Sequence, residues 1–278
     1  MKIYSNQTVL EATKKRLNWI FDEFPNVVVS VSGGKDSTVV FELSYEIAKE
    51  RGRLPLRVFF IDQEAEWGAT IEQIQSIMYR EGVDPYWMQV PMVLFNATSH
   101  QDHWLKCWDP DKRALWIHPQ DPISKKENIY GTDRFEHMFK EVFRVEFGNT
   151  PTANIGGVRA QESPTRMTAL TYAPKYKWVT WGKKFYAELK HYTFYPIYDW
   201  GYTDVWKAIY DHDWNYNKIY DLQYQYGVGL NDMRVSNVHH ETAVQNLFNV
   251  QEMEPDLYSR LTNRLEGIDM ATKMGKDD

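Results

Sequence analysis

The strongest constraint on the fold of this chain is an apolar run that leads directly into a glycine-rich turn. The run Val27-Val28-Val29 is β-branched, as is typical of a buried strand. It is followed by Ser30-Val31-Ser32-Gly33-Gly34-Lys35-Asp36-Ser37 and then by a helical pattern. The glycines permit a tight turn and a close approach of main-chain N–H groups to an anion, and the helix dipole points at the same turn. The sequence therefore predicts a phosphate cradle between a strand and a helix.

This cradle differs from two common phosphate loops. A Walker A loop has Ser or Thr directly after its Lys, whereas Asp36 follows Lys35 here. A Gly-x-Gly-x-x-Gly dinucleotide fingerprint is also missing from the turn. Because a carboxylate beside a polyphosphate is repelled unless a cation lies between them, Asp36 predicts a bound Mg²⁺ ion.

Composition limits the classes of function. The 278 residues are enough for one large domain or a domain with an appendage, and the net charge of −6 argues against broad, charge-driven binding of nucleic acid, though not against a local basic patch. The first residues lead into a polar helix, and no apolar run approaches about 18 residues, so we expect neither a signal peptide nor a membrane span. The single cysteine, Cys107, excludes an internal disulfide and a single-chain iron–sulfur cluster, and it predicts a cytoplasmic protein.

Strand and helix patterns alternate along the chain, which predicts an α/β fold with a doubly wound, mostly parallel five-stranded sheet. The predicted elements are a helix at 6–24, a strand at 26–31, a helix at 37–50, a strand at 56–61, a helix at 67–82, a strand at 86–90, a helix at 132–147, a strand at 153–158, a helix from 161, short strands at 178–180 and 192–195, a helix at 204–211 capped by Thr203, and a helix from Asn217. Residues 92–131 break the rhythm and predict an insertion over the carboxyl ends of the strands. We assign 1–235 to a nucleotide-binding domain and 236–278 to a mostly helical C-terminal extension.

A second glycine pair, Gly156-Gly157, precedes a charged segment. If the segment from residue 159 is helical, Arg159, Glu162 and Arg166 share one face. Two guanidiniums there would hold a phosphate or sulfate, and Glu162 would hold the two Arg side chains in place. A surface ion-pair ladder is the alternative, but a ladder does not require the glycine pair.

Two acidic groups have open interpretations. Asp62 closes the second predicted strand, so it is either a ligand of a ribose or base, or the cap of the next helix. Around Asp199 and Asp204, helix capping and core packing of the neighbouring Trp200 and Trp206 explain the pattern better than chemistry does.

The insertion contains His100, His103 and Cys107, and His118 follows. The spacing is compatible with zinc ligands on one helical face, while ordinary packing explains such residues more often. A role for Cys107 as a nucleophile lacks an identifiable partner base.

Together these motifs resemble the phosphoadenosine phosphosulfate (PAPS) reductase family within the PP-loop N-type ATP pyrophosphatases. The resemblance rests on Ser32-Gly33-Gly34-Lys35-Asp36-Ser37, Ile61-Asp62, Gly157-Val158-Arg159-x-x-Glu162-Ser163-x-x-Arg166 and Pro196-Ile197-x-Asp199-Trp200-x-x-x-Asp204-Val205-Trp206. Cys107-Trp108-Asp109, 216–222 and 233–235 are similar to the prophage-type IbrA-like subfamily, whose members are often encoded beside a ParB-like partner. The resemblance implies an adenine nucleotide α-hydrolase-like, HUP-type fold.

The resemblance also implies that the chain binds ATP or PAPS, and we expect Mg²⁺-dependent cleavage of ATP between the α- and β-phosphates, with adenylyl transfer and release of pyrophosphate. Lys35 would neutralise the leaving group, Asp36 would bind Mg²⁺, and Arg159 and Arg166 would hold the acceptor or the α-phosphate. The expected nucleotide-binding residues are Ser30, Ser32, Gly33, Gly34, Lys35, Asp36, Ser37, Asp62, Gly157, Arg159, Glu162 and Ser163.

Two alternatives stay open. A sulfonucleotide reductase would use Cys107 or a partner's thiol, because the family's C-terminal Glu-Cys-Gly-Leu-His motif has no counterpart between Arg264 and Asp278. A non-catalytic nucleotide-sensing regulator would act with a ParB-like partner. The load of aromatic residues favours a homodimer, and Lys183, Lys184 and Lys190 are candidates for binding a 3′-phosphate.

Overall fold

The computed structural model describes residues 6–97, 103–186, 188–230, 233–235, 237–238 and 247–269. The chain forms two compact units, each assembled from separate segments. The first unit comprises Met1–Phe59, Ile77–Pro85 and Glu146–Tyr216, and the second comprises Phe60–Ser76, Tyr86–Val145 and Asn217–Asp278. These boundaries do not test the predicted division at residue 235, which stays a prediction.

A six-stranded sheet has the order β3-β2-β1-β6-β8-β7. Its strands are β1 (Asn26–Ser30), β2 (Leu56–Ile61), β3 (Val83–Met88), β6 (Thr152–Ile155), β7 (Gly182–Tyr186) and β8 (His191–Phe194). β1 pairs in parallel with β2 and β6, and β6 pairs in parallel with β8, whereas β7 runs antiparallel to β8. The predicted α/β class and mostly parallel sheet are confirmed.

The number of strands differs from the prediction, because the sheet has six strands rather than five. The strand expected at 178–180 is wrong. Residues 176–179 instead form a tight turn, in which the N–H of Val179 donates to the carbonyl of Tyr176 and Lys177 has a φ of 49°. The strand follows at β7, whose residues Lys183 and Lys184 are exposed. An edge strand with exposed lysines lacks the apolar pattern by which a buried strand is recognised.

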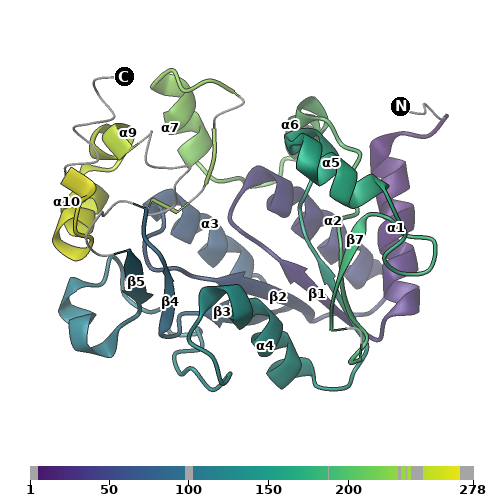
Figure 1. Ribbon diagram of the computed structural model, residues 1–278. Helices are drawn as coiled ribbons and strands as arrows, with labels where there is room; N and C mark the ends of the chain where they lie inside the picture. Colours follow the sequence, from purple (N-terminus) through teal and green to yellow (C-terminus); the bar gives the residue numbers. More distant parts are fainter. Residues whose placement is uncertain are drawn as a thin grey trace. The chain divides into compact units, whose positions relative to one another are not determined.

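The first unit contains α1 (Val9–Glu23), α2 (Lys35–Glu50), α5 (Pro164–Thr171) and α6 (Tyr202–Asp211) (Figure 1). α2 contacts β1, α1 and α6. Thr8 and Glu11 form a capping box at the start of α1. The cap predicted at Thr203 is wrong, because Gly201 precedes α6 and its N–H donates to Asp204 Oδ2 at 2.7 Å. This helix therefore begins with a carboxylate at its third residue, which compensates the N–H groups of the first turn.

The second unit contains most of α3 (Gly68–Met78) and α4 (Phe135–Phe147), together with α7 (Ile219–Gln225), α9 (Leu247–Met253) and α10 (Pro255–Arg264). Asn217 precedes α7 as predicted, and its Oδ1 accepts from the N–H of Ile219 at 2.9 Å. The insertion at 92–131 is more regular than expected. It forms an antiparallel ribbon of β4 (Met92–Phe95) and β5 (Trp104–Cys107), followed by a 3-10 helix at Pro110–Leu115.

Among the helices that the structure describes, none combines the length and apolar character that crossing a membrane requires. The prediction of no membrane span agrees with this finding.

Candidate functional site

The turn after β1 is held in shape by its own side chains. Gly33 has a φ of 70°, in the left-handed region that favours glycine. Ser37 Oγ accepts from the N–H of Ser32 at 3.1 Å and donates to the carbonyl of Gly34 at 2.9 Å. Thr38 Oγ1 donates to the same carbonyl at 3.1 Å. The predicted turn between β1 and a helix is therefore present, with α2 beginning at Lys35, and the binding of phosphate by this turn stays a prediction.

The second glycine pair lies against this turn. A Cβ atom on Gly157 would be 2.6 Å from the main-chain nitrogen of Ser37 and 2.7 Å from the carbonyl carbon of Asp36. Main-chain atoms at the start of a packed helix cannot rotate away, so residue 157 must be glycine. The sequence indicated that the glycine pair has a role, but it did not predict the contact of Gly157 with Asp36 and Ser37.

Asp36 lies between two cations. Its Oδ2 is 3.2 Å from Lys35 Nζ, and its Oδ1 accepts from Arg159 Nε. The side chains of Lys35 and Arg159 are only 10% and 7% exposed. Lys35 Nζ also lies 5.6 Å from the centre of the Tyr202 ring. These two cations already balance the carboxylate, so the argument that Asp36 needs Mg²⁺ loses its force, and the metal role of Asp36 stays a prediction.

The segment after Gly157 is not the continuous helix expected from 161. A 3-10 turn at Ala160–Glu162 is followed by α5, because Ser163 is extended and its Oγ caps α5 by accepting from the N–H of Arg166 at 3.1 Å. Glu162 Oε1 accepts from the main-chain N–H of Arg159 at 2.8 Å, and its other oxygen pairs with Arg166.

The two guanidiniums pair with different carboxylates, and the binding of one anion by both stays a prediction. Arg159 pairs with Asp36, whereas Arg166 pairs with Glu162. The side chain of Arg166 is 48% exposed, so it is the one of the two that a ligand can reach without first entering the interior.

Ser30 has a structural contact. Its Oγ donates to Asn154 Oδ1 at 2.7 Å, which links β1 to β6. Lys183 and Lys184 lie on β7, and Lys190 lies just before β8 with a φ of 57°. Binding of a 3′-phosphate by these lysines stays a prediction.

The acidic motif around Asp199 agrees only in part with the packing interpretation, because Trp200 is buried whereas Trp206 is partly exposed and Asp199 pairs with Arg16. Arg16 makes two hydrogen bonds to the Asp199 carboxylate, at 2.7 and 2.6 Å, and its guanidinium carbon lies 4.7 Å from the centre of the Tyr198 ring. Trp200 is buried, and its Nε1–H donates to Thr13 Oγ1 at 2.8 Å. The role of Arg16 could not be predicted from the sequence, because the residues around it in α1 do not indicate that its partner lies 183 residues away.

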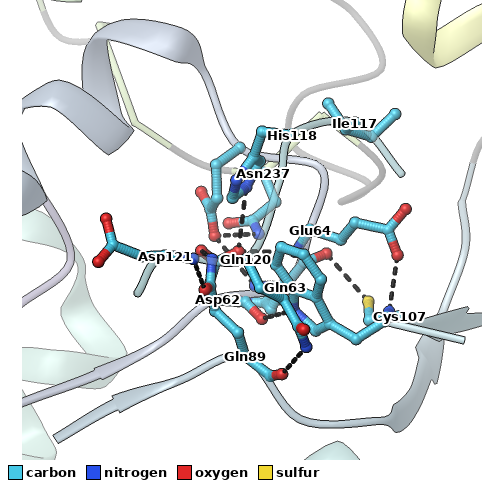
Figure 2. Close-up of polar contacts among 12 residues, drawn as sticks. Asp62, Gln63, Glu64, Gln89, Cys107, Ile117, His118, Gln120, Asp121 and Asn237 are labelled. Atoms are coloured by element: carbon cyan, nitrogen blue, oxygen red, sulfur yellow. Dashed lines mark hydrogen bonds and ion pairs between the residues drawn. The ribbon is translucent and has the colours of Figure 1, made fainter. Parts of the chain in front are cut away.

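In the second unit, Asp62 is the centre of a buried network (Figure 2). Its Oδ2 accepts from Trp87 Nε1 at 3.0 Å and from Gln89 Nε2 at 2.9 Å. Its Oδ1 accepts from the N–H of Glu64 at 2.9 Å and lies 3.4 Å from His118 Nε2. The side chain is fully buried. This internal role was not among the two interpretations of Asp62, and a contact with a nucleotide stays a prediction.

Burial and charge shift two further groups in this network. Burial raises the pKa of Glu66 to about 8, and the nearby carboxylate of Asp62 adds to the effect. Asn237 Nδ2 donates to Glu66 Oε1 at 2.6 Å. Burial alone would lower the pKa of His118, but the carboxylate of Asp62 outweighs it, so the pKa of His118 is raised above its usual value.

Cys107 is not a candidate nucleophile in this structure. Its thiol is buried and donates to the carbonyl of Gln63 at 2.9 Å (Figure 2). Burial raises the pKa of Cys107 well above its usual value, and the nearby carboxylate of Glu64 acts in the same direction. Since the thiolate is the reactive form, a thiol held in this way is inert.

The zinc interpretation also gains no support. Among the residues that the structure describes, no group of three or more His, Cys, Asp or Glu side chains is placed to hold a metal ion. His103 stacks on Phe95 with ring centres 6.1 Å apart. His100 lies outside the described residues.

Comparison with known proteins places these features in a family. Residues 26–229 match the model of the phosphoadenosine phosphosulfate reductase domain. An uncharacterized protein of Escherichia coli, YbdN, is 32% identical over 276 residues, which cover 94% of this chain and 66% of that protein. The uncharacterized protein MJ0973 of Methanocaldococcus jannaschii is 24% identical over 250 residues, which cover 90% of this chain and 48% of that protein. The chain thus spans about two thirds of the length of the first relative and about half of the length of the second.

The chain is also similar to two solved structures. FMN adenylyltransferase from Candida glabrata, in complex with FMN and an ATP analogue, is 17% identical, with a TM-score of 0.48 over 79% of this chain and 64% of that chain. PAPS reductase from Candida auris, in a phosphate complex, is 15% identical, with a TM-score of 0.48 over 86% of this chain and 98% of that chain. At this level of similarity neither structure carries an argument about the activity of the chain.

Proposed function

Because this chain belongs to the phosphoadenosine phosphosulfate reductase domain family, we propose that it binds an adenine nucleotide and cleaves ATP between the α- and β-phosphates. The observation that supports this most is the ordered turn at 32–37. Ser37 Oγ makes hydrogen bonds to the main chain of the turn, and Gly157 packs against its main-chain atoms. Main-chain N–H groups in a turn of this kind, at the start of a 16-residue helix, are typical ligands of a polyphosphate. In this turn the N–H groups of Ser32 and Gly34 donate to Ser37 Oγ and Ser32 Oγ, at 3.1 and 3.4 Å, and they exchange these partners for phosphate oxygens when the nucleotide binds.

In the proposed reaction, an acceptor oxygen forms a bond to the α-phosphorus while the bond between the α-phosphorus and the bridging oxygen breaks. Pyrophosphate leaves with the bonding electrons, and the acceptor releases its proton. The turn and Lys35 hold the leaving pyrophosphate, and Arg166 holds the acceptor or the α-phosphate. Arg159 acts through Asp36, because it pairs with that carboxylate. Catalysis of this type depends on positioning and on charge stabilisation.

A Mg²⁺ ion belongs to the same proposal, since nucleotide phosphates usually carry one that is bound through one or two carboxylates and phosphate oxygens. It would neutralise phosphate charge. Asp36 fits such an ion only if it exchanges Lys35 or Arg159 for it, because both of its oxygens face cations.

The proposal is tested with ATP labelled on the α- or the γ-phosphate, together with a matched pair of variants. Lys35→Ala removes the cation at the start of α2, while Lys49→Ala removes an exposed cation in the last turn of the same helix. We expect the wild-type chain and Lys49→Ala to release pyrophosphate, and Lys35→Ala to lose about 10²-fold or more in rate. Release of ADP and phosphate would contradict the proposal, as would an unaffected Lys35→Ala variant.

Tight nucleotide binding without any turnover would favour the nucleotide-sensing regulator instead. A reductase that uses Cys107 is disfavoured by the burial of that thiol, and a reductase with a partner's thiol would release sulfite from PAPS in the presence of thioredoxin. Placement in the prophage-type IbrA-like subfamily, a ParB-like partner, a homodimer and a cytoplasmic location are further parts of the proposal, and they rest on the sequence resemblance and composition.

A further inference from the structure

The second unit contains an open cavity of about 680 Å³, lined largely by exposed residues, that shares only His118 with the features described above. Its lining consists of residues 113–120, Lys126, and Arg260 and Asn263 of α10. Residues 113–120 include the end of the 3-10 helix and the segment that follows it. Cavities that bind small molecules are usually about 300–1,000 Å³ in volume. The cavity is therefore large enough for an organic ligand with several charged groups.

The charges that line this cavity have one sign. Arg113, Lys126 and Arg260 contribute three cations, and the lining contains no Asp or Glu. Arg113 lies over the Trp116 ring at 5.7 Å, and Arg260 Nη1 donates to the carbonyl of Ile117 at 3.1 Å. No carboxylate among the described residues pairs with any of the three cations. In a chain with a net charge of −6, three cations gathered without counterions repel each other until an anion joins them.

His118 also belongs to the lining, and the Asp62 carboxylate balances a positive charge on its ring, so the net positive charge of the lining comes from Arg113, Lys126 and Arg260. Its Nδ1 lies 3.2 Å from the carbonyl oxygen of Pro119, and its Nε2 lies 3.4 Å from Asp62 Oδ1. Both neighbours are acceptors, and a ring whose two nitrogens face acceptors is favoured in its protonated form. The edge of the ring packs against Trp108 with ring centres 5.1 Å apart.

The wall that α10 contributes is firmly attached within the second unit. Arg264, one turn after Arg260, donates to the Glu64 carboxylate at 2.6 and 3.0 Å and to the carbonyl of Lys106 at 2.7 Å. Arg260 and Asn263 are three residues apart, so they lie on one side of the helix. The helix that carries Arg260 is thus fixed before a ligand arrives, which reduces the entropic cost of binding at this wall.

We propose that this cavity binds a small ligand that carries two or more phosphate or sulfate groups. Guanidinium groups bind such groups through two parallel hydrogen bonds, and Lys126 supplies a point charge beside them. Gln120 and Asn263 offer neutral amides for the uncharged part of the ligand. None of the lining residues belongs to the turn at 32–37, and the proposal does not depend on the proposed function.

The test measures binding of pyrophosphate to the full chain by titration calorimetry, in the wild type and in a Lys35→Ala background. The first series replaces cations of the lining with Arg113→Gln, Lys126→Gln and Arg260→Gln. The control is Lys112→Gln, which removes the same charge from an exposed neighbour of Arg113 outside the lining. Thermal unfolding of each variant reports whether the fold is intact, and Lys126→Gln breaks no hydrogen bond seen in the structure.

We expect pyrophosphate to bind the Lys35→Ala chain, and each lining variant to weaken this binding about tenfold or more, while Lys112→Gln changes it less than about twofold. Absence of binding to folded Lys35→Ala chains, or equal effects of Lys112→Gln and the lining variants, would overturn the proposal. A short single-stranded oligonucleotide is the second ligand. If it binds more tightly than pyrophosphate and is lost in the same variants, the cavity is part of a nucleic-acid surface and the small-ligand assignment is wrong.

A failure of this test is distinguishable from a failure of the proposed function. ATP cleavage depends on Lys35 and is measured as released pyrophosphate, whereas the cavity is measured by binding in a background that lacks Lys35. Either result can be positive while the other is negative.

Discussion

Arg264 at the end of α10 donates two hydrogen bonds to the carboxylate of Glu64, 200 residues earlier, at 2.6 and 3.0 Å. The two side chains are only 3% and 1% exposed. Glu64 itself has a φ of 67°, a conformation that is uncommon for residues other than glycine. Its other contact is the N–H of Trp108, which donates to Oε2 at 2.7 Å. The pair thus fixes the chain that follows β2 to the C-terminal helix.

Removing one partner of this pair leaves the other charge buried. We expect Arg264→Met to lower the free energy of unfolding by about 3–5 kcal/mol, because an uncompensated buried carboxylate is costly. The double variant Glu64→Gln/Arg264→Met recovers part of this loss, since glutamine still accepts from Trp108 without carrying a charge. Denaturant unfolding of both variants measures the difference. A loss below about 1 kcal/mol in Arg264→Met would mean that the ion pair does not form.

Gly157→Ala tests the contact between the second glycine pair and the turn. Its Cβ would lie 2.6 Å from the Ser37 nitrogen, so the start of α2 must move. Gly156→Ala is the control, because the Cβ there meets side-chain atoms of Tyr195 and Thr193, the nearest at 3.1 Å, and no main-chain atom of the turn. We expect ATP to raise the melting temperature of Gly156→Ala and to leave that of Gly157→Ala unchanged, since only a bound ligand stabilises the fold. Equal shifts in both variants would place the nucleotide elsewhere.

Cys107 should be protected from alkylation in the folded chain. The thiol is buried and its pKa is raised by burial, so iodoacetamide reacts with it only after unfolding. Mass spectrometry before and after addition of denaturant measures the modification. We further expect Cys107→Ala to retain nucleotide binding and to lose roughly 1 kcal/mol of stability. Fast alkylation of the native chain would reopen the reductase that uses this thiol.

The stability of the fold should fall as the pH rises from about 5 to 8. Burial raises the pKa of Glu66 from 4.5 to about 8, so in this range the folded state holds a proton that the unfolded state has lost. The contribution is fully present below pH 4.5 and is lost as the pH passes about 8. His118, whose pKa is also raised, acts in the same direction above its ordinary value of 6.5.

Glu66→Gln isolates the contribution of Glu66 to this pH dependence. Glutamine keeps an acceptor for Asn237 but has no proton to lose, so the variant should resemble the wild type near pH 5 and exceed it in stability near pH 8. Denaturant unfolding at several pH values gives the slopes. A wild-type slope that is unchanged in Glu66→Gln would show that Glu66 is ionised in the folded chain throughout.

Local patterns were sufficient to predict the strand, turn and helix between Asn26 and Glu50. The β-branched run marks β1, and the glycines with the following helical pattern mark the turn and α2. Contacts between distant residues left no such signal. Arg159 was expected beside Arg166, yet it reaches Asp36, 123 residues earlier. The order of the strands in the sheet determines which carboxylate lies close to the guanidinium of Arg159. The residues next to Arg159 in the sequence do not encode that order.

The polar strand β7 shows the same limit for secondary structure. Its sequence, Gly-Lys-Lys-Phe-Tyr, begins with glycine and two exposed lysines, and the strand pairs with β8 on one side only.

The buried carboxylate of Asp62 could not be predicted from its local sequence either. A carboxylate after a strand is equally typical of a ligand contact and of a helix cap. The partners of Asp62 are Trp87, Gln89 and His118, and they come close to it only in the folded chain.

Both units draw on chain segments that lie far apart in the sequence, which has a consequence during synthesis. The contact of Thr13 with Pro196 closes the first unit, and that of Glu64 with Arg264 closes the second. Neither unit can therefore finish folding until the ribosome has produced its late segments, which contain Pro196 and Arg264. The apolar strands of the early segments must meanwhile be kept from aggregating. Translation speed and chaperone supply should thus decide how much native protein a cell obtains.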